Sequence, residues 1–352
     1  MKLAPRPLER MIARIFSQVG CQPKEADCIA AHLVDSNLVG HDSHGVIRVP
    51  PYVTWAREGK VVPNQQLEII TQSDALAIVD GGFGFGQVIG EQAVDLGIAK
   101  ALKQGVAVIG LRNCGHLGRI GDWAEQAARA GIISLHFVNT SGAGVLVAPW
   151  GGIDRRLSAN PIAAGIPRSE GAPLILDIST CSIAEGKIRV AFNKGVNVPE
   201  GSIIDSHGQP TIDPKVFYAD PPGAILPFGG HKGYALGMIT ELLAGVLTGG
   251  GCSATGVKRL SNGMLSIYVD PKALVAEEAY TAEIARYIDF VKSSRTVTPG
   301  GEILMPGEPE QRTRATRTAQ GIDLDETTWG QLVSTWESVG LDRKELASIV
   351  EG

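Results

Sequence analysis

The hydrophobic pattern of the chain changes twice, and this constrains the fold more than any other feature of the sequence. Apolar residues follow helical spacing over residues 8–39, with a further short helix expected over residues 52–57. Helical spacing returns over residues 276–292 and from residue 328 to the end. Between about residues 71 and 270, short apolar runs typical of strands alternate with helical stretches. This order predicts an α/β unit flanked by helical segments.

The length of 352 residues is enough for two domains. We expect a discontinuous helical domain made of residues 1–72 plus 271–352, with an α/β domain of residues 73–270 inserted in it. A Pro/Gly-rich loop is expected over residues 298–309. A cleft between two such domains is a usual place for a ligand.

Charge and cysteine usage exclude several classes of partner. Lys and Arg total 32 against 37 for Asp and Glu, so no basic field exists to attract nucleic acid. The longest apolar stretch, residues 234–248, contains Glu241 and falls short of the ~20 residues that cross a membrane. The start of the chain lacks the apolar region of a secretory signal. Five scattered cysteines without a CxxC pattern are typical of a reducing compartment, so we expect a cytoplasmic protein.

The strongest candidate for chemistry is the segment GHDSHGVIR at residues 40–48. If the chain turns helical after Gly45, His44 and Arg48 lie about one turn apart and can reach the same small molecule. Histidine exchanges a proton near neutral pH, and arginine offers a planar fork that matches a carboxylate. The alternative is structural: Asp42 and Ser43 would cap the next helix, with the histidines at the surface.

A metal site is a second alternative for the same segment. His41 and His44, together with Asp177, would then serve a metal-dependent hydrolase or lyase. Against this, the sequence lacks an HExxH pattern, and Asp42 lies too close to both histidines to share the ion.

Two glycine-rich segments differ in what they predict. The cluster at residues 81–90 reads GxGxxxG from Gly84, and no second strand ending in an acidic residue follows about 20 residues later. This argues against a Rossmann fingerprint. Residues 113–121 instead read as a strand, a glycine-rich turn and a helix, which brings backbone N–H groups toward an anion. Cys114 and His116 are too close in sequence to make a good nucleophile and base pair.

Two single residues carry weaker signals. Asp177 ends a short apolar run and would orient a histidine, or else cap the helix that follows. Lys232 precedes the helical stretch of residues 234–247 and would attract phosphate, or else be a solvated lysine.

Taken in order along the chain, these segments resemble the type-2 malate/L-lactate dehydrogenase family, and most closely its bacterial hydroxycarboxylate dehydrogenases. The matching segments are residues 40–52, 84–87, 113–118, 159–161, 176–180, 231–233 and 306–308. The resemblance implies hydride transfer between NADH or NADPH and the C2 carbonyl of a 2-oxo acid. It also implies a non-Rossmann NAD(P)-binding domain with a largely antiparallel sheet, a homodimer and no catalytic metal.

The resemblance implies a role for each matching residue. His44 would give the proton to the substrate oxygen, with Ser43 and Asp177 in support. Arg48 would hold the substrate carboxylate. His116 would meet the nicotinamide, and in some relatives this histidine has the acid/base role.

Further residues match substrate- and cofactor-binding segments. Tyr52 and Asn160 would contact substrate. Relatives commonly have a small or aromatic residue where Arg119 stands, so the pocket or the phosphate preference is expected to differ here. The positions matched to cofactor binding are His116, Gly118, Arg119, Ile120, Thr140, Ser141, Asp177, Ile178, Ser179, Thr180, His231, Lys232, Gly233, Pro306, Gly307 and Glu308.

Overall fold

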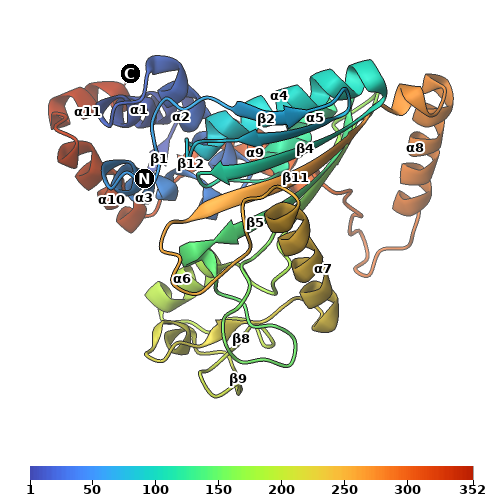
Figure 1. The fold of residues 1–352 in the computed structure, drawn as a ribbon. Coiled ribbons are helices and arrows are strands. Elements are labelled where there is room, and N and C mark those ends of the chain that lie inside the picture. Colours follow the sequence, from blue (N-terminus) through green and yellow to red (C-terminus); the bar gives the residue numbers. More distant parts are fainter. Residues whose placement is uncertain (352) are drawn as a thin grey trace.

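A seven-stranded sheet runs through the middle of the computed structural model, which describes residues 1–351 (Figure 1). Its strand order is β2-β3-β4-β11-β5-β6-β7. The seven strands are β2 (Glu68–Gln72), β3 (Leu76–Asp80), β4 (Val106–Cys114), β11 (Ser261–Val269), β5 (Ile133–Ser141), β6 (Ile162–Ile166) and β7 (Leu174–Ile178). The β3–β4 pairing is parallel, and the other five pairings are antiparallel. The predicted α/β fold with a largely antiparallel sheet is therefore confirmed.

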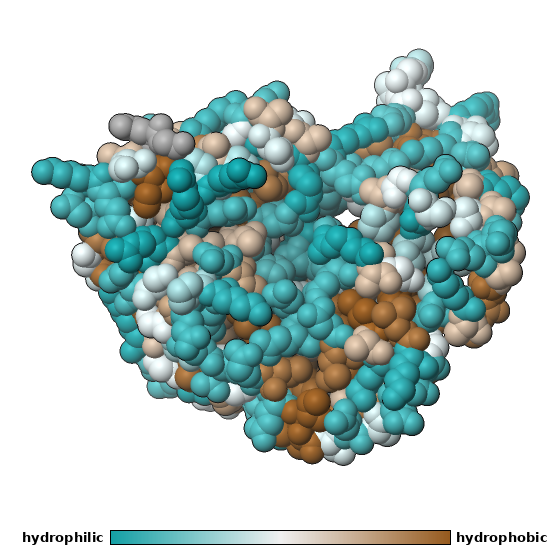
Figure 2. Space-filling view, turned by 90° about the horizontal axis from the view of Figure 1, so that it is seen from above, coloured by the Kyte–Doolittle hydropathy of each residue, from teal (hydrophilic) through white to brown (hydrophobic). Residues whose placement is uncertain are grey.

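Helices cover both faces of this sheet. On one face lie α4 (Gly86–Gln104) and α5 (Gly121–Arg129), whose buried residues Val94 and Trp123 join a core with Leu111 and Tyr268 of the strands. On the other face, α7 (His231–Glu241) continues as a π-helical segment, Leu242–Val246, which contacts β4, β5 and β11. Seen from above, the molecule is largely hydrophilic with separate hydrophobic patches (Figure 2).

Both ends of the chain contribute to a second core beside the sheet (Figure 1). Met11 and Leu33 come from the first helices and Trp336 from a late one, and all three are almost fully buried. The N-terminal ammonium donates to the Leu324 carbonyl at 2.6 Å. The elements of this group are β1 (Lys2–Leu3), α1 (Pro5–Gln18), α2 (Pro23–Leu38), α3 (Val49–Arg57), β12 (Ile322–Asp323), α10 (Glu326–Ser338) and α11 (Arg343–Glu351).

A third core belongs to a lobe below the sheet in Figure 1. It contains the buried side chains of Ile188, Ile203 and Phe217. Its elements are α6 (Glu185–Lys194), β8 (Ile203–Ile204), β9 (Pro210–Thr211) and β10 (Ala224–Ile225).

Three elements differ from what the sequence pattern predicts. Strand β2 lies within the first 72 residues, where only helices were expected. The pattern did not show it, because all five of its residues are exposed and no apolar alternation marks a buried face. Helix α9 (Glu308–Gln320) has no buried residue, so no periodicity marked it. Helix α8 (Glu277–Lys292) forms where a helix was expected, but it lies at the far end of the sheet from the terminal helices with which it was grouped (Figure 1). There the Tyr280 hydroxyl donates to the Pro167 carbonyl at 2.9 Å.

Two further observations bear on the sequence expectations. Within residues 1–351, none of the helices combines the length and the apolar composition that crossing a bilayer requires. All five cysteines are free thiols. The division of the chain into the two predicted domains stays a prediction.

The central strand β5 contains a buried histidine, His136. Its Nδ1 lies 2.8 Å from the Ser266 hydroxyl and its Nε2 lies 2.9 Å from the Ser134 hydroxyl. Burial lowers the pKa of His136 to about 3, because the charged imidazolium cannot be solvated there. The folded protein therefore holds this ring neutral over most of the acidic range.

We expect His136 to make the fold sensitive to acid. Between its ordinary pKa of 6.5 and the folded value of about 3, the unfolded chain binds a proton that the folded chain does not. The free energy of unfolding must therefore fall as pH falls through this window, by at most about 1.4 kcal/mol per pH unit from this group. Urea unfolding between pH 4 and 7 should show a shallower pH slope for His136→Gln. The exposed His207→Gln serves as control, and an unchanged slope in His136→Gln would contradict the expectation.

Candidate active site

A tight turn follows α2 and contains the HDSHG residues. It consists of two single 3₁₀ turns, Asp42–His44 and Val46–Arg48. The side chain of Asn37 holds it from inside: its oxygen accepts from the Val46 N–H at 2.8 Å, and its amide donates to Asp42 at 2.6 Å. A Cβ at Gly45 would lie 2.1 Å from the Asn37 oxygen, so this position must be glycine.

Helix α9 fixes the same turn from outside. Arg317 pairs with both carboxylate oxygens of Asp42, at 2.5 and 3.0 Å, and also donates to the Asn37 carbonyl. The His41 Nε2 lies 3.3 Å from the Glu310 carboxylate. Sequence reasoning missed these contacts, because the residues are more than 260 positions apart and α9 itself gave no signal.

Two histidines from distant segments stack beside this turn. The rings of His44 and His116 are nearly parallel, at 8°, with centroids 5.6 Å apart. The His44 Nδ1 lies 3.1 Å from the Ser43 hydroxyl, so the predicted support of His44 by Ser43 is present as a contact.

The tautomer of His116 follows from its neighbours. The Gln87 amide donates to the Tyr52 oxygen at 3.2 Å and to the His116 carbonyl at 3.3 Å. The Tyr52 hydroxyl proton is thus available to His116 Nδ1, 2.6 Å away. Neutral His116 then carries its own proton on Nε2.

The glycine cluster of residues 81–90 serves this site through close packing. A Cβ at Gly86 would lie 2.1 Å from the His116 carbonyl oxygen, so only glycine lets the start of α4 approach this loop. This close packing also places Gln87 next to Tyr52 and His116. Sequence reasoning did not assign Gln87 to the site. A polar residue directly after a glycine cluster and at the start of a helix was the available signal.

The electrostatics of the site favour neutral imidazoles. Burial, and then the charge of Arg48, lower the pKa of His116 to about 3 and that of His44 well below its usual 6.5. Arg48 donates from Nε to the Ser43 carbonyl at 2.6 Å. Within residues 1–351 its guanidinium makes no ion pair. The arrangement is two proton-exchanging rings beside a cation that is free to bind an anion.

Asp177 lies beside a different histidine from the predicted one. Its carboxylate accepts from the Gly121 N–H at 3.0 Å and lies 4.0 Å from the His41 Nδ1. Burial raises the pKa of this carboxyl. The predicted pairing with His44 is corrected accordingly: β7 ends against the first turn of α5, and His41 is the histidine of the turn that faces it.

Two other predicted residues are buried and already engaged. Arg119 is 2% exposed and pairs with Asp122 and with Glu125. Asn160 is fully buried, and its amide donates to the Gly237 carbonyl at 3.0 Å and to Glu241 at 2.7 Å. Their predicted contacts with cofactor and substrate stay predictions.

Most of the remaining predicted cofactor positions gather along β7. The Pro306 carbonyl accepts from the Ile175 N–H at 3.1 Å, which places residues 306–308 beside this strand. The Thr180 carbonyl accepts from the Phe228 N–H at 3.2 Å. This contact brings the end of β7 close to the first turn of α7, where His231 and Lys232 are exposed.

Other predicted cofactor positions lie elsewhere or are occupied. Glu308 pairs with Lys292 at 2.5 Å and accepts from the Met305 N–H. Ile120 is buried. Thr140 and Ser141 lie at the end of β5, where the Thr140 hydroxyl accepts from the Asn262 amide at 2.8 Å.

The lower lobe also reaches the HDSHG turn. A Cβ at Gly186, in the first turn of α6, would lie 2.9 Å from the Ser43 Cβ. Sequence reasoning did not single out this contact. The contact between Gly186 and Ser43 places the neighbouring His44 between the terminal helices and the lobe that contains α6.

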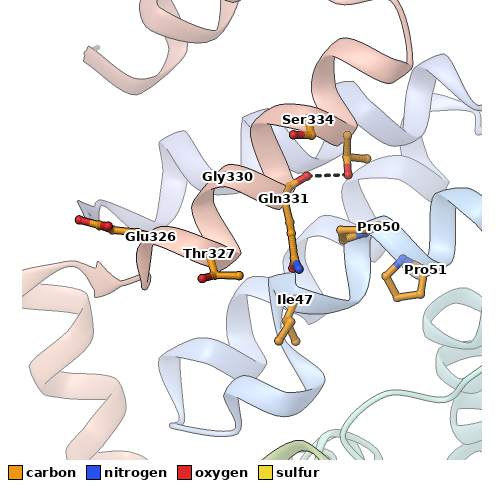
Figure 3. Close-up of a pocket in the computed structure, with 9 residues that line it drawn as sticks. Ile47, Pro50, Pro51, Glu326, Thr327, Gly330, Gln331 and Ser334 are labelled. Atoms are coloured by element: carbon orange, nitrogen blue, oxygen red, sulfur yellow. Dashed lines mark hydrogen bonds between the residues drawn. The ribbon is translucent and has the colours of Figure 1, made fainter. Parts of the chain in front are cut away.

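One cavity lies away from these residues. It measures about 550 Å³ and lies between α3 and α10, lined among others by Ile47, Pro50 and Gln331 (Figure 3). A smaller crevice is lined by Tyr52, Phe85 and His116. The candidate active site is identified by its side-chain chemistry and not by this cavity.

The metal alternative fails on geometry. Among the described residues, the one group of three His, Cys, Asp or Glu side chains with ligand atoms within 4.8 Å of one another is Cys28, His32 and Glu91. His41, His44 and Asp177 do not form such a group. A metal-dependent hydrolase or lyase at the HDSHG turn is therefore not favoured.

The fold and this site match a known class of oxidoreductases. The family model described as malate/L-lactate dehydrogenase matches residues 3–333. The chain belongs to the malate/L-lactate dehydrogenase family, and the resemblance seen in the sequence is confirmed.

Individual relatives agree with this assignment. Hydroxycarboxylate dehydrogenase B of Escherichia coli (strain K12) is 39% identical over 98% of this chain and 96% of its own. L-sulfolactate dehydrogenase of Methanocaldococcus jannaschii is 35% identical over 97% of this chain and 98% of its own. A solved E. coli structure assigned as a malate/lactate dehydrogenase superposes with a TM-score of 0.95 at 38% identity, covering 100% of this chain and 99% of the other.

Proposed function

We propose that the protein is an NAD(P)-dependent 2-hydroxy acid dehydrogenase. One observation carries this: two stacked neutral imidazoles, His44 and His116, lie beside an Arg48 guanidinium that makes no ion pair within residues 1–351. A 2-hydroxy acid offers the two groups that such a site binds, a carboxylate for the arginine and an oxygen at C2 for a histidine.

The surroundings of the turn fit a nicotinamide nucleotide. Its phosphates need a cation, and the first turn of α7 supplies one, because Lys232 is exposed there after two glycines with positive φ. When bound, NADH or NADPH supplies the hydride for C2 of a 2-oxo acid. Residues 177–180, at the end of β7, and residues 306–308 would contact the remainder of the nucleotide.

Arg48, His44 and His116 would each have a separate role in the reaction. Arg48 binds the substrate carboxylate and so orients C2, which is worth several kcal/mol in well-aligned reactions. His44, held through Nδ1 by Ser43, exchanges a proton with the substrate oxygen from Nε2. His116 donates a hydrogen bond from its Nε2–H, in the tautomer set by Tyr52.

Substrate binding would itself change the pKa of His44. The charge of Arg48 is one cause of the low pKa of His44. A carboxylate bound at Arg48 cancels that charge, so the pKa of His44 rises in the complex. The ring therefore becomes a better proton carrier when substrate is present.

We also propose a non-Rossmann cofactor domain and a homodimer. The antiparallel pairings around β11 support a domain of residues 73–270, inserted in a helical domain of residues 1–72 plus 271–352, although β2 shows that the sheet begins earlier. The dimer is supported by an exposed apolar surface along α7 and the π segment. Its residues are Leu236, Ile239, Leu242, Val246 and Leu247.

An assay with a panel of 2-oxo acids tests the function. Each acid is mixed with the protein and either NADH or NADPH, and loss of the reduced-nicotinamide absorbance is followed. Turnover of at least one 2-oxo acid is expected, and it should persist in the presence of a chelator. Absence of turnover across a panel that includes 2-oxo acids with sulfonate and carboxylate side chains would overturn the proposal.

We expect His44→Ala to lower kcat by about 10²- to 10⁴-fold, the usual range for loss of a general acid or base. Steady-state kinetics with the best acid from the panel measures this, and His207→Ala, at an exposed position, serves as control. Wild-type turnover in His44→Ala would remove this ring from the role and point to His116.

Arg48→Lys should mainly raise KM, because a point charge cannot reproduce the two-pronged contact with a carboxylate. The measurement is the separate change in KM and kcat for the same acid. An unchanged KM would place the substrate carboxylate elsewhere.

A further inference from the structure

A cluster of metal-ligating side chains lies outside the proposed active site. Cys28 and His32 are one turn apart on α2, and Glu91 faces them from α4. Their ligand atoms lie within 4.8 Å of one another. The two helices contact each other.

The histidine of this cluster is oriented by a buried carboxylate. The His32 Nδ1 lies 3.1 Å from Asp122, which is 6% exposed and also pairs with Arg119. With its Nδ1 proton donated to Asp122, neutral His32 has a free lone pair on Nε2. Histidines that bind metals almost always donate their other N–H to such a carboxylate. Asp122 is not one of the three proposed ligands, so its contact with His32 is a separate observation in favour of a metal site.

The spacing and the charges also fit a divalent ion. The Cys28 Sγ lies 3.2 Å from a Glu91 oxygen, and two such ligands on a tetrahedral zinc ion would be about 3.6 Å apart. A thiolate and a carboxylate together balance a charge of two. Without metal, burial and the neighbouring Glu91 raise the pKa of the Cys28 thiol, so metal binding must release its proton.

We propose that Cys28, His32 and Glu91 bind a thiophilic divalent cation of the zinc class, with water in the fourth position. The thiolate ligand excludes magnesium and calcium, which prefer oxygen ligands. Because α2 belongs to the core of the terminal helices and α4 to the core of the sheet, the ion ties the two cores together. The site is structural and takes no part in hydride transfer.

The test uses the full-length protein after removal of metal with a chelator. Co²⁺ is added as a spectroscopic probe, and its visible and thiolate charge-transfer bands are followed. Zn²⁺ binding is measured by calorimetry and by thermal unfolding. We expect one equivalent per chain, tetrahedral Co²⁺ bands with a thiolate band, and a higher Tm with Zn²⁺.

Matched variants locate the ion. Cys28→Ser should abolish the thiolate band, and Glu91→Gln, at an exposed position, should weaken binding without disturbing the fold. Asp122→Asn should weaken binding by about 10- to 100-fold, the range seen when the carboxylate behind a ligating histidine is lost. Cys252→Ser, at the other partly exposed cysteine, serves as control and should bind like the wild type.

The result is independent of the proposed dehydrogenase activity, because every readout is binding or stability. Affinity should also fall as pH falls, since the thiol has to lose its proton. Binding that is unchanged in both Cys28→Ser and Glu91→Gln, Co²⁺ spectra without a thiolate band, or no binding at all would each overturn the proposal.

Discussion

The clamping of the turn after α2 is the interaction on which the site depends. Asn37 holds the turn from within, and Arg317 neutralises Asp42 and binds the end of α2 from α9. With both contacts made, His44 and Arg48 are fixed on a rigid base instead of a loop.

The electrostatic character of the site follows from this base. Arg48 donates one N–H to the Ser43 carbonyl of its own turn and forms no ion pair with a carboxylate among residues 1–351. Burial, together with the uncompensated charge of Arg48, lowers the pKa of the adjacent imidazoles and keeps them neutral. The guanidinium that would bind an anionic substrate thus also contributes to the low pKa of both histidines.

The sequence predicted the parts of the site that are local in the chain. His44, Ser43 and Arg48 lie within one short segment, so their spacing was visible, and the failed glycine fingerprint agreed with the antiparallel sheet that the structure has. Partners from other segments were not predictable. Asp177 faces His41 because of where β7 ends, and Gln87 reaches His116 through the packing of α4.

The pairing of Asp42 with Arg317 joins residues 275 positions apart. Such a contact closes a very long loop, and the entropy lost on closure has to be offset by the contacts that form with it. During synthesis, residues 40–48 and Asn37 leave the ribosome early, but Arg317 follows only when almost the whole chain has been made. The turn therefore cannot be held from its outer side before α9 has been synthesised.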